Sequence, residues 1–322
     1  MRVLTRRDLE EVLDMRTVID AVERGLVEHA RGTVSMPPRQ IHAVGGAGTT
    51  LVMSAFLGGM QALALKAVSE FSGNRARGLP SIQGAVLLLD ATTGEVLALM
   101  DGATITALRT GAAGALAARS LSVVDAQVAG ILGTGAQART QIQGLWVVRD
   151  LQLVKAYSPT KAHVRSFCEE VADQLHVDAL VADEPAEVVE GSDVVITATN
   201  ATTPVLPGEW LQEGVHVTSI GGGPCRELDP EVYRRARVVV DWREGALGEA
   251  RDLQEAIAQG AFSPEGIEAE LGELVAGTKP GRVSKDEITL FRSVGMALED
   301  AATAAVAYRR AEEADVGTQV EA

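Results

Sequence analysis

A glycine-rich stretch in the middle of the chain has the clearest chemical meaning. The apolar run Val128–Leu132 leads directly into Gly133-Thr134-Gly135-Ala136-Gln137-Ala138, and a helical pattern follows. In a strand–turn–helix setting, G-x-G-x-x-A is typical of the turn that binds the pyrophosphate of a dinucleotide. The first glycine permits the tight turn, the second lets the phosphate approach the backbone, and the alanine lets helix and strand pack closely. The alternative is a turn with a purely structural role; we expect all six residues to form a dinucleotide site.

The end of the next expected strand, Leu153–Tyr157, bears on which dinucleotide is bound. At this position an Asp or Glu binds the ribose 2′-hydroxyl in sites that prefer NAD. Here the residues are Ser158, Thr160 and Lys161, which supply hydroxyls and a cation but no carboxylate. These residue types favour a 2′-phosphate, so we expect NADP(H) to be preferred, with NAD(H) possible. Lys161 could instead be an ordinary solvated helix residue.

Lys66 lies in the middle of another expected strand. The two-residue period of a strand places it on the same face as Ala64 and Val68. A lysine among such neighbours needs an anionic partner or a wet cleft, because an unpaired buried charge is costly. Glu70 shares this face, but four residues along a strand span about 13 Å, too far for a salt bridge. A substrate carboxylate would satisfy Lys66; the alternative is a side chain that extends into solvent.

Two arginines could join Lys66 in an anion site. If Thr106 caps the helix expected over Thr106–Ser120, Arg109 falls in its first turn, where a cation opposes the helix dipole. A guanidinium beside a helix N-terminus is a good clamp for a carboxylate. Arg39 follows two prolines on a stiff extended segment and could add a third cation, although such a position is commonly just exposed.

The elements that position these residues change in type along the chain. A helix is expected from Thr5 to Ala30, with capping-box spacing at its start. Short apolar runs separated by glycine-containing turns then predict antiparallel strands at Thr50–Leu57, Ala62–Phe71, Gly84–Asp90 and Val96–Asp101. The last helical pattern, Leu290–Ala314, is expected to pack back on this first part of the chain.

From Ala126 onward, strand-like runs alternate with helical patterns. The expected strands are Val128–Leu132, Leu153–Tyr157, Asp193–Thr197, Val215–Ile220 and Arg237–Asp241. Alternation of this kind predicts βαβ units and a doubly wound parallel sheet. We therefore expect an α/β protein, with a Rossmann-type domain over residues 121–290, an α+β domain over residues 1–120 and a returning helix over residues 291–322.

Composition excludes several classes of function. The 322 residues carry a net charge of −15, so neither nucleic acid nor an anionic membrane is an expected partner. The two cysteines, Cys168 and Cys225, form no disulfide framework, and the five histidines show no metal-ligand spacing. The N-terminus lacks the apolar segment of a signal peptide. We expect a cytoplasmic protein without a metal centre.

Several blocks together resemble one known family, the ornithine cyclodeaminase/mu-crystallin family, over nearly the whole chain. The blocks are Met36–Arg39, the Lys66 strand, Leu108–Ala113, Gly133–Ala138 and Thr289–Gly295. The resemblance implies a nucleotide domain inserted into a substrate and dimerisation domain, and a homodimer. It also implies that Arg39, Lys66 and Arg109 bind a substrate carboxylate, Lys66 and Arg109 being catalytic, that Thr110 contacts the cofactor, and that Thr199 and Val294 line the nicotinamide region.

One loop departs from the family pattern. Cyclodeaminating members have an aspartate after the fifth strand, whereas the segment from Ile220 to Asp229 reads IGGGPCRELD; it is shorter and has glycine in that place. Asp229, followed by Pro230 and Glu231, fits an N-cap of the next helix and is not an obvious substitute. Glu227 keeps its family position, and we expect it to be structural.

The missing aspartate favours reduction over deamination. Cyclodeamination needs a carboxylate for several proton transfers. Reduction of an imino acid that arrives protonated needs only a fixed carboxylate, a placed nicotinamide and exclusion of water. We therefore expect an NAD(P)H-dependent imino-acid (ketimine) reductase, or the reverse amino-acid dehydrogenase. The alternatives are an ammonia lyase that uses bound NAD and a non-catalytic, crystallin-like NADPH-binding protein. His42 is a conceivable proton donor, and Cys225 could line the pocket.

Overall fold

The computed structural model describes residues 1–222 and 225–321. The chain divides into two compact units, and each combines helices with a β-sheet. Unit 1 comprises Met1–Arg109 and Met296–Ala322, and unit 2 comprises Thr110–Gly295. No helix in the described part of the chain combines the length and the apolar character that a bilayer crossing requires.

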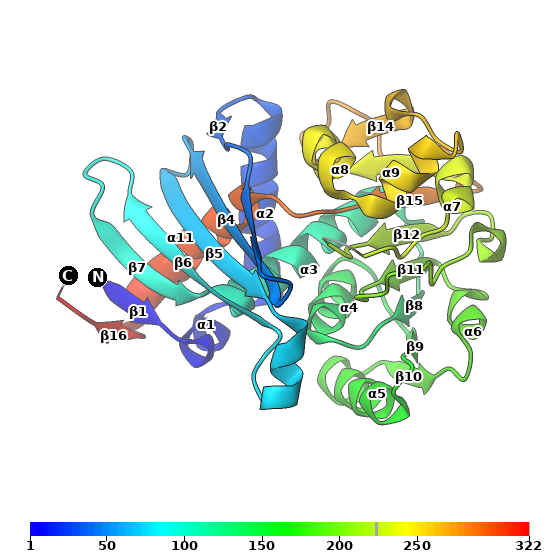
Figure 1. Ribbon diagram of the computed structural model, residues 1–322, viewed down its shortest axis with the longest axis horizontal. Helices are drawn as coiled ribbons and strands as arrows, with labels where there is room; N and C mark the ends of the chain where they lie inside the picture. Colours follow the sequence, from blue (N-terminus) through cyan, green and yellow to red (C-terminus); the bar gives the residue numbers. More distant parts are fainter. Residues whose placement is uncertain (223–224, 322) are drawn as a thin grey trace. The chain divides into compact units, whose positions relative to one another are not determined.

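The sheet of unit 1 has the strand order β16-β1-β7-β6-β5-β4-β2, and β3 also pairs with β4 (Figure 1). Its strands run antiparallel except for the parallel pair β1 and β7. The strands are β1 (Arg2–Leu4), β2 (Val34–Ser35), β3 (Gln40–Val44), β4 (Gly48–Leu57), β5 (Ala62–Glu70), β6 (Ile82–Asp90), β7 (Val96–Asp101) and β16 (Thr318–Gln319). The strands β4 to β7 confirm the four expected ones. The sequence did not predict the other four; β1, β2 and β16 have only two or three residues each, and β3 is exposed along its whole length.

Helices cover one face of this sheet. The helices of unit 1 are α1 (Arg6–Val12), α2 (Met15–Ala30) and α11 (Ala297–Ala314), with a short 3-10 turn at Ser72–Arg77. Helix α11 packs on β4, β5 and β6 and against α2. The strand period places every second residue of β5 toward this cover, and Ala62, Ala64, Lys66 and Val68 are all buried. The last helix therefore packs on elements from the first part of the chain.

The single helix expected from Thr5 to Ala30 is wrong, because the chain breaks it into α1 and α2. Leu13 is extended, and the side chain of Asp14 accepts a hydrogen bond from the N–H of Thr17, which starts a second helix. The predicted capping box at Thr5 is present. An internal N-cap of this kind is hidden in the sequence because the apolar spacing continues across it.

Unit 2 contains a parallel sheet with the order β10-β9-β8-β11-β12-β15-β13-β14, which confirms the doubly wound fold. The strands are β8 (Val128–Leu132), β9 (Leu153–Tyr157), β10 (Asp178–Val181), β11 (Val194–Thr197), β12 (His216–Ser219), β13 (Arg237–Val240), β14 (Ile267–Glu270) and β15 (Thr289–Arg292). The strand order reverses beside β8. In doubly wound sheets, ligands bind at this point, outside the carboxyl ends of the strands.

The helices of unit 2 connect these strands (Figure 1). They are α4 (Ala136–Val148), α5 (Lys161–Leu175), α6 (Pro185–Val189), α7 (Pro230–Arg235), α8 (Arg243–Glu249), α9 (Arg251–Ala258) and α10 (Leu271–Val275), with 3-10 turns at Gly208–Trp210 and Pro264–Gly266. Helix α3 (Gly102–Leu121) begins in unit 1 and ends in unit 2.

The expected helix over Leu290–Ala314 is wrong in its first part. Thr289–Arg292 is strand β15, which pairs with β12 and β13 in the interior of the parallel sheet. The four residues are all buried. Only Leu290 and Phe291 of these four residues are apolar, and two adjacent apolar residues suit a buried strand and a buried helix equally well, so periodicity alone could not separate them.

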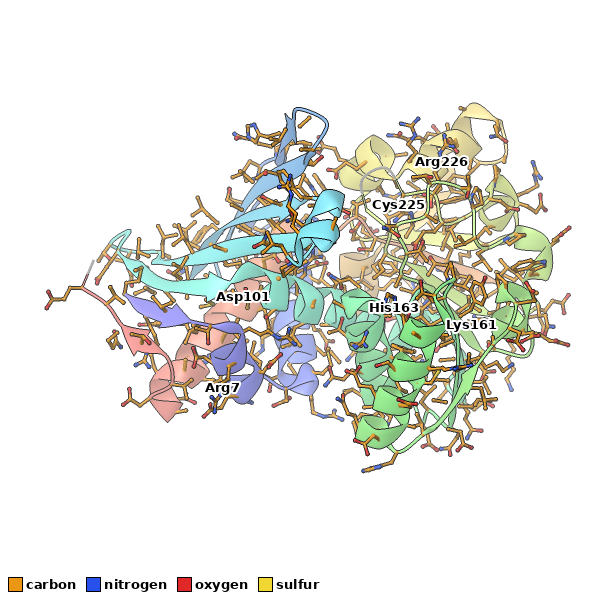
Figure 2. The ribbon with its side chains drawn as sticks, turned by 60° about the horizontal axis from the view of Figure 1, so that its bottom comes forward. Arg7, Asp101, Lys161, His163, Cys225 and Arg226 are labelled. Atoms are coloured by element: carbon orange, nitrogen blue, oxygen red, sulfur yellow. The ribbon has the colours of Figure 1, made fainter. Side chains whose placement is uncertain are left out.

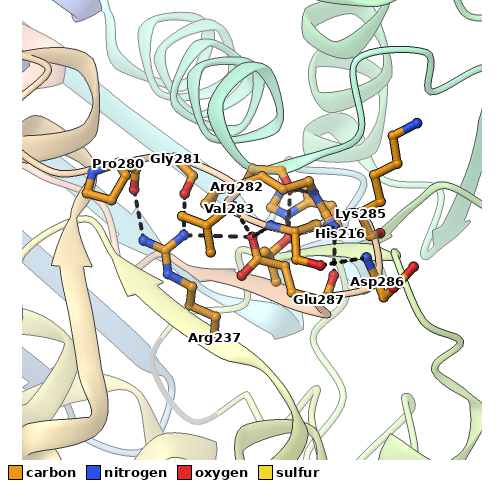
Figure 3. A network of polar contacts seen from close by, with 12 residues as sticks. His216, Arg237, Pro280, Gly281, Arg282, Val283, Lys285, Asp286 and Glu287 are labelled. Atoms are coloured by element: carbon orange, nitrogen blue, oxygen red, sulfur yellow. Dashed lines mark hydrogen bonds and ion pairs between the residues drawn. The ribbon is translucent and has the colours of Figure 1, made fainter.

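A network around Arg282 braces the amino-terminal edge of this sheet (Figure 3). The Arg282 guanidinium donates to the carbonyl oxygens of Leu121 and Glu287, at 2.7 and 2.6 Å, and to the hydroxyl of Thr289 at 3.2 Å. Arg237, the first residue of β13, donates to the carbonyl oxygen of Pro280 at 2.8 Å. These bonds fix the starts of the strands.

Candidate active site

Lys66 lies on the covered face of the unit 1 sheet. Its neighbours in the register are Met53 of β4 and Val86 of β6, and both are buried. Lys66 is 2% exposed; its Nζ lies 2.6 Å from Asp300 Oδ2 and donates to Thr106 Oγ1 at 3.3 Å. The solvent-exposed alternative is therefore wrong, and the anionic partner present in the structure is a carboxylate of the chain itself.

The charge of Lys66 is finely balanced. Burial lowers the pKa of Lys66 to about 8; the Arg109 guanidinium adds to this shift, and Asp300 opposes it. An ammonium group has three N–H donors, and Asp300 and Thr106 use two of them. Lys66, with this pKa, is therefore cationic near neutral pH and readily deprotonated above about pH 8.

Arg109 lies at the start of the third turn of α3 and not in the first turn. The helix begins at Gly102, and Asp101 Oδ1 accepts hydrogen bonds from the N–H and the hydroxyl of Thr104. Thr106 is not the N-cap, since its hydroxyl donates to the carbonyl oxygen of Gly102 at 2.7 Å. The expected clamp of guanidinium and helix N-terminus is therefore wrong, because Arg109 comes about two turns after the helix begins.

Two acidic residues in the first turn of α11 hold both cations. Arg109 Nη1 donates to Glu299 Oε2 at 2.6 Å, and Arg109 Nε lies 3.3 Å from Asp300 Oδ1. All four side chains are buried. Because Asp300 contacts Lys66 through one oxygen and Arg109 through the other, it fixes the spacing of the two positive charges. Removing one member of such a buried group costs about 3–5 kcal/mol, since a charge is left uncompensated.

Sequence reasoning missed Glu299 and Asp300. Acidic residues near a helix N-terminus are favourable for the helix dipole and attract no attention by themselves. The residues around them could have indicated burial, because the two adjacent acids are flanked by Ala297-Leu298 and Ala301-Ala302. A helix that is apolar around both acids is buried, and buried acids require cations.

The structure places Arg39 in unit 1, directly before β3, and leaves it partly buried. Gln40 pairs with Val52 of β4, and the next residue of β4, Met53, pairs with Lys66. Arg39 is thus separated from Lys66 by two strand spacings, about 10 Å at the level of the backbone. His42 lies on the exposed strand β3.

In unit 2, the glycine turn has the conformation that its sequence predicts. Gly133 has a φ of +97°, and a Cβ at this position would overlap the carbonyl oxygen of Ala198. A Cβ at Gly135 would meet nothing within 4 Å, so the backbone is open there. Helix α4 starts without a side-chain cap, and Ala138 is fully buried. An open backbone at an uncapped helix start fits the pyrophosphate of a dinucleotide.

Arg139 braces this turn from within α4. Its Nη1 donates to the carbonyl oxygens of Thr134 and Gly135, at 2.9 and 3.2 Å. Its Nε donates to Glu170 Oε2 of α5 at 2.7 Å. The carbonyl groups of the turn are thereby held on the arginine side, and the shape of the turn is set before any ligand binds.

The end of β9 lies beside the glycine turn, since the N–H of Gly133 donates to the carbonyl oxygen of Tyr157 at 2.9 Å. Ser158 follows directly, and Thr160 is the N-cap of α5 without a side-chain capping bond. Lys161 is labelled at the start of α5 in Figure 2, and its Nζ lies 2.8 Å from Asp183 Oδ1. The structure therefore brings these residues to the turn but gives Lys161 a carboxylate partner.

Thr110 is buried where α3 packs closely on α4. A Cβ at Gly111 would overlap the backbone of Thr140, and one at Gly144 would overlap the backbone of Gly111. The carbonyl oxygen of Thr110 accepts a hydrogen bond from Gln141 Nε2 at 2.7 Å. These contacts fix Thr110 beside the helix that starts at the glycine turn.

Thr199 and Val294 follow the carboxyl ends of β11 and β15. The N–H of Thr199 donates to Glu227 Oε1 at 2.6 Å, and the N–H of Val294 donates to Asp241 Oδ2 at 2.7 Å. Both carboxylates are fully buried. The two buried carboxylates thus hold the backbone just beyond the ends of β11 and β15, at the edge of the sheet where doubly wound folds bind ligands.

The departing loop is described only in part, since Gly223 and Pro224, the positions nearest the expected aspartate, lie outside the described residues. Beyond them, Cys225 is buried, and Figure 2 labels it on this loop. Asp229 caps α7 by accepting from the N–H of Val232 at 3.1 Å, as its sequence predicts. The Asp229 carboxylate therefore serves as the N-cap of α7.

Comparison with known proteins identifies the family. A family model described as "Ornithine cyclodeaminase/mu-crystallin family" matches residues 1–315, and the chain belongs to this family. It is 35% identical to the Delta(1)-pyrroline-2-carboxylate reductase of Bacillus cereus, with 100% of each sequence covered.

Solved structures agree with this assignment. The Delta(1)-pyrroline-2-carboxylate reductase of Thermococcus litoralis was solved in complex with NADH and L-proline, and it is 42% identical to this chain. The two structures superpose with a TM-score of 0.97, and the superposition covers 99% of this chain and 100% of that one. An archaeal alanine dehydrogenase dimer with bound NAD is 35% identical. It superposes with a TM-score of 0.94, and the superposition covers 100% of this chain and 99% of that one. The predicted family and fold class are confirmed.

Proposed function

We propose that the chain is an NAD(P)H-dependent oxidoreductase that reduces a small 2-imino acid, cyclic or alkylated on nitrogen, to the amino acid, or catalyses the reverse amino-acid dehydrogenation. The observation that carries this proposal is the buried pair of cations, Lys66 and Arg109, held by Asp300 in a chain that also has a dinucleotide turn. The relative from Thermococcus litoralis was solved with NADH and L-proline, the amino acid that reduction of pyrroline-2-carboxylate yields.

The role of Lys66 and Arg109 is to bind the substrate carboxylate, with Arg39 as a third cation. A carboxylate held by a guanidinium and an ammonium fixes the adjacent C2 atom in position and orientation. The reduced nicotinamide, when bound, supplies the hydride. A substrate that arrives as an iminium ion accepts this hydride at C2 and becomes a neutral amine nitrogen without needing a further acid. Exclusion of water protects the iminium from hydrolysis.

The dinucleotide site comprises the turn from Gly133 to Ala138, with Thr110, Thr199 and Val294 as further cofactor contacts. We propose NADP(H) as the preferred form, with NAD(H) accepted, because the end of β9 offers the hydroxyls of Ser158 and Thr160 and no carboxylate. Lys161 contributes by turning from Asp183 toward a 2′-phosphate. The test is the ratio of kcat/KM for NADPH and NADH; a preference for NADH would contradict this assignment.

We also propose a homodimer, formed through the uncovered face and edge of the unit 1 sheet. Leu65 is 38% exposed on the face opposite Lys66, and the register places Val44 of the edge strand β3, which is 43% exposed, on the same face. Ile41 of β3 is 56% exposed at the edge. Exposed apolar side chains on one face and edge of a sheet mark an interaction surface. Light scattering coupled to gel filtration measures the mass directly, and a monomer at micromolar concentration would contradict the proposal.

The proposed setting is the cytoplasm, with a small amino or imino acid as substrate and neither nucleic acid nor membrane as a partner. Cys168 and Cys225 are buried thiols that form no disulfide, as a reducing compartment leaves them. The net charge of −15 disfavours polyanionic partners.

A substrate panel tests the function. Oxidation of NADPH is followed with Δ1-pyrroline-2-carboxylate, with Δ1-piperideine-2-carboxylate, and with pyruvate plus ammonia or methylamine. Release of ammonia from ornithine is assayed in parallel. Turnover of an imino acid supports the reductase, ammonia release without net cofactor turnover supports the lyase alternative, and tight NADPH binding with no turnover supports the non-catalytic alternative.

A further inference from the structure

Five hydrogen-bond donors converge on the carboxylate of Glu227, which is fully buried. Its Oε1 accepts from the N–H of Thr199 at 2.6 Å and from the Thr199 hydroxyl at 2.9 Å. Its Oε2 accepts from the hydroxyls of Thr197 and Ser219, at 2.8 and 2.9 Å, and from the N–H of Gly221 at 2.8 Å. A side chain that satisfies so many donors from two loops fixes the relative position of those loops.

These donors surround the ligand-binding edge of the sheet. Thr197 and Ser219 are the last residues of β11 and β12, and Thr199 and Gly221 each lie just beyond a strand end. Ala198, between Thr197 and Thr199, packs closely on the glycine turn. A Cβ added at Gly133 would overlap the carbonyl oxygen of Ala198. The loop that Glu227 holds is therefore in contact with the glycine turn.

A second buried group holds Glu227 itself. The N–H of Glu227 donates to Asp252 Oδ2 at 3.3 Å. Asp252 Oδ1 accepts from Arg292 Nε at 2.9 Å and from the hydroxyl of Tyr233 at 3.0 Å. All four side chains are buried, so the backbone at Glu227 is anchored from β15 and α7 as well.

We propose that Glu227 is a positioning residue for the nicotinamide end of the cofactor. This inference rests on the proposed function. Glu227 holds the backbone of Thr199 and Gly221 at the carboxyl edge, so that the bound nicotinamide keeps one depth and one orientation relative to the substrate. Only a carboxylate can do this, because it accepts at both oxygens. An amide at this position presents an NH2 group to one of the two backbone N–H donors, Thr199 or Gly221, and forces that loop to move.

Asp193, the residue directly before β11, provides a control at the other end of that strand. Its Oδ2 accepts from the N–H groups of Gln127 and Val128, at 2.8 and 2.9 Å, and so joins the starts of β8 and β11. Asp193 and Glu227 thus perform the same type of bracing at opposite ends of β11. A purely structural role for Glu227 predicts that E227Q and D193N have similar effects.

The experiment compares the full-length E227Q and D193N variants with the wild type, using NADH and Δ1-pyrroline-2-carboxylate. We expect both variants to have a lower Tm. Only E227Q should lose kcat, by about 100-fold, with KM for the imine changed less than about threefold. Its bound NADH should also lose most of the fluorescence enhancement seen with the wild type, a readout that needs no turnover. D193N should keep kcat and fluorescence within about twofold.

The proposal is overturned if E227Q keeps both kcat and bound-NADH fluorescence, or if D193N loses them equally. If E227Q does not fold, S219A removes one donor to Glu227 and leaves the carboxylate in place. We then expect a loss of about three- to tenfold in kcat with KM unchanged, and an unchanged kcat would overturn the proposal. A wild type that enhances NADH fluorescence but turns over no imine would contradict the proposed function, while the fluorescence comparison would still decide the role of Glu227.

Discussion

Arg109 is held by two carboxylates, so its removal has two separable effects. We predict that R109A loses kcat/KM for the imino acid by about 10²–10³-fold, because a charge-assisted contact to the substrate carboxylate disappears. The affinity for NADPH should change less than about threefold, since the dinucleotide turn belongs to unit 2. The variant should also unfold more readily, because Glu299 keeps a buried charge. Steady-state kinetics, NADPH titration and thermal unfolding measure the three quantities.

R119A is the matched control, because Arg119 lies on the same helix and is exposed. It should leave kcat/KM unchanged. If R109A lost cofactor affinity as strongly as turnover, Arg109 would be a structural residue and its assignment to the substrate would be wrong.

The lowered pKa of Lys66, about 8, predicts the basic side of the pH profile. Burial is the main cause of the shift, and above this pH the side chain is neutral and no longer attracts a carboxylate. We therefore expect kcat/KM for the imino acid to fall above about pH 8. In K66R the fall should move to higher pH, because a guanidinium stays charged. Profiles of both proteins at saturating cofactor test this, and superimposable profiles would exclude Lys66 as the titrating group.

At the scale of residues, sequence reasoning found the cations and missed the acids. The strand period was sufficient to place Lys66 on the face of Ala64 and Val68, and this face is buried. The partner, Asp300, lies far along the chain, and no local pattern could connect the two. The pairing exists because α11 packs on β5, which is a tertiary fact.

At the scale of elements, His216 links two neighbouring strands of unit 2. Its ring nitrogens lie 3.0 Å from the hydroxyls of Thr289 and Thr218. Burial, with Arg282 and Arg149 nearby, lowers the pKa of His216 to about 3. The ring is therefore neutral in the folded protein at pH values where the unfolded chain, with a pKa near 6.5, binds a proton.

The sign of the resulting pH dependence follows directly. Between pH 6.5 and 3 the unfolded state binds more protons, so the free energy of unfolding falls as the pH is lowered, by about 1.4 kcal/mol per unit. From pH 6.5 to 5 the predicted loss is about 2 kcal/mol. Denaturant unfolding of the wild type and H216Q at both pH values measures it. Equal losses in the two proteins would show that His216 does not contribute.

The elements of unit 2 were predictable where the chain alternates clearly, and β8 and β9 have the expected bounds. Two of the mispredicted elements have clear physical reasons. Residues 289–292 are all buried although only Leu290 and Phe291 are apolar, so their pattern carries no informative period. Helix α3 starts at Gly102, earlier than expected, because Asp101 caps it through Thr104, and Thr106 only resembled a cap.

At the scale of the whole molecule, the two units divide the work of the proposed reaction. Unit 1 contains the cations that we propose bind the substrate carboxylate, and unit 2 contains the glycine turn that we propose binds the dinucleotide. With a net charge of −15, the proposed anionic substrate has to be attracted by local positive charge against the field of the molecule. The sequence could indicate both sites separately because each has a local signature.

The central claim is that Lys66 and Arg109 bind a carboxylate of the substrate. The most direct measurement compares kcat/KM for Δ1-pyrroline-2-carboxylate with that for Δ1-pyrroline, which is the same cyclic imine without the carboxylate. We predict a loss of at least about 10³-fold for Δ1-pyrroline, because the buried cations gain no anionic partner from it. Similar values for the two imines would contradict the account.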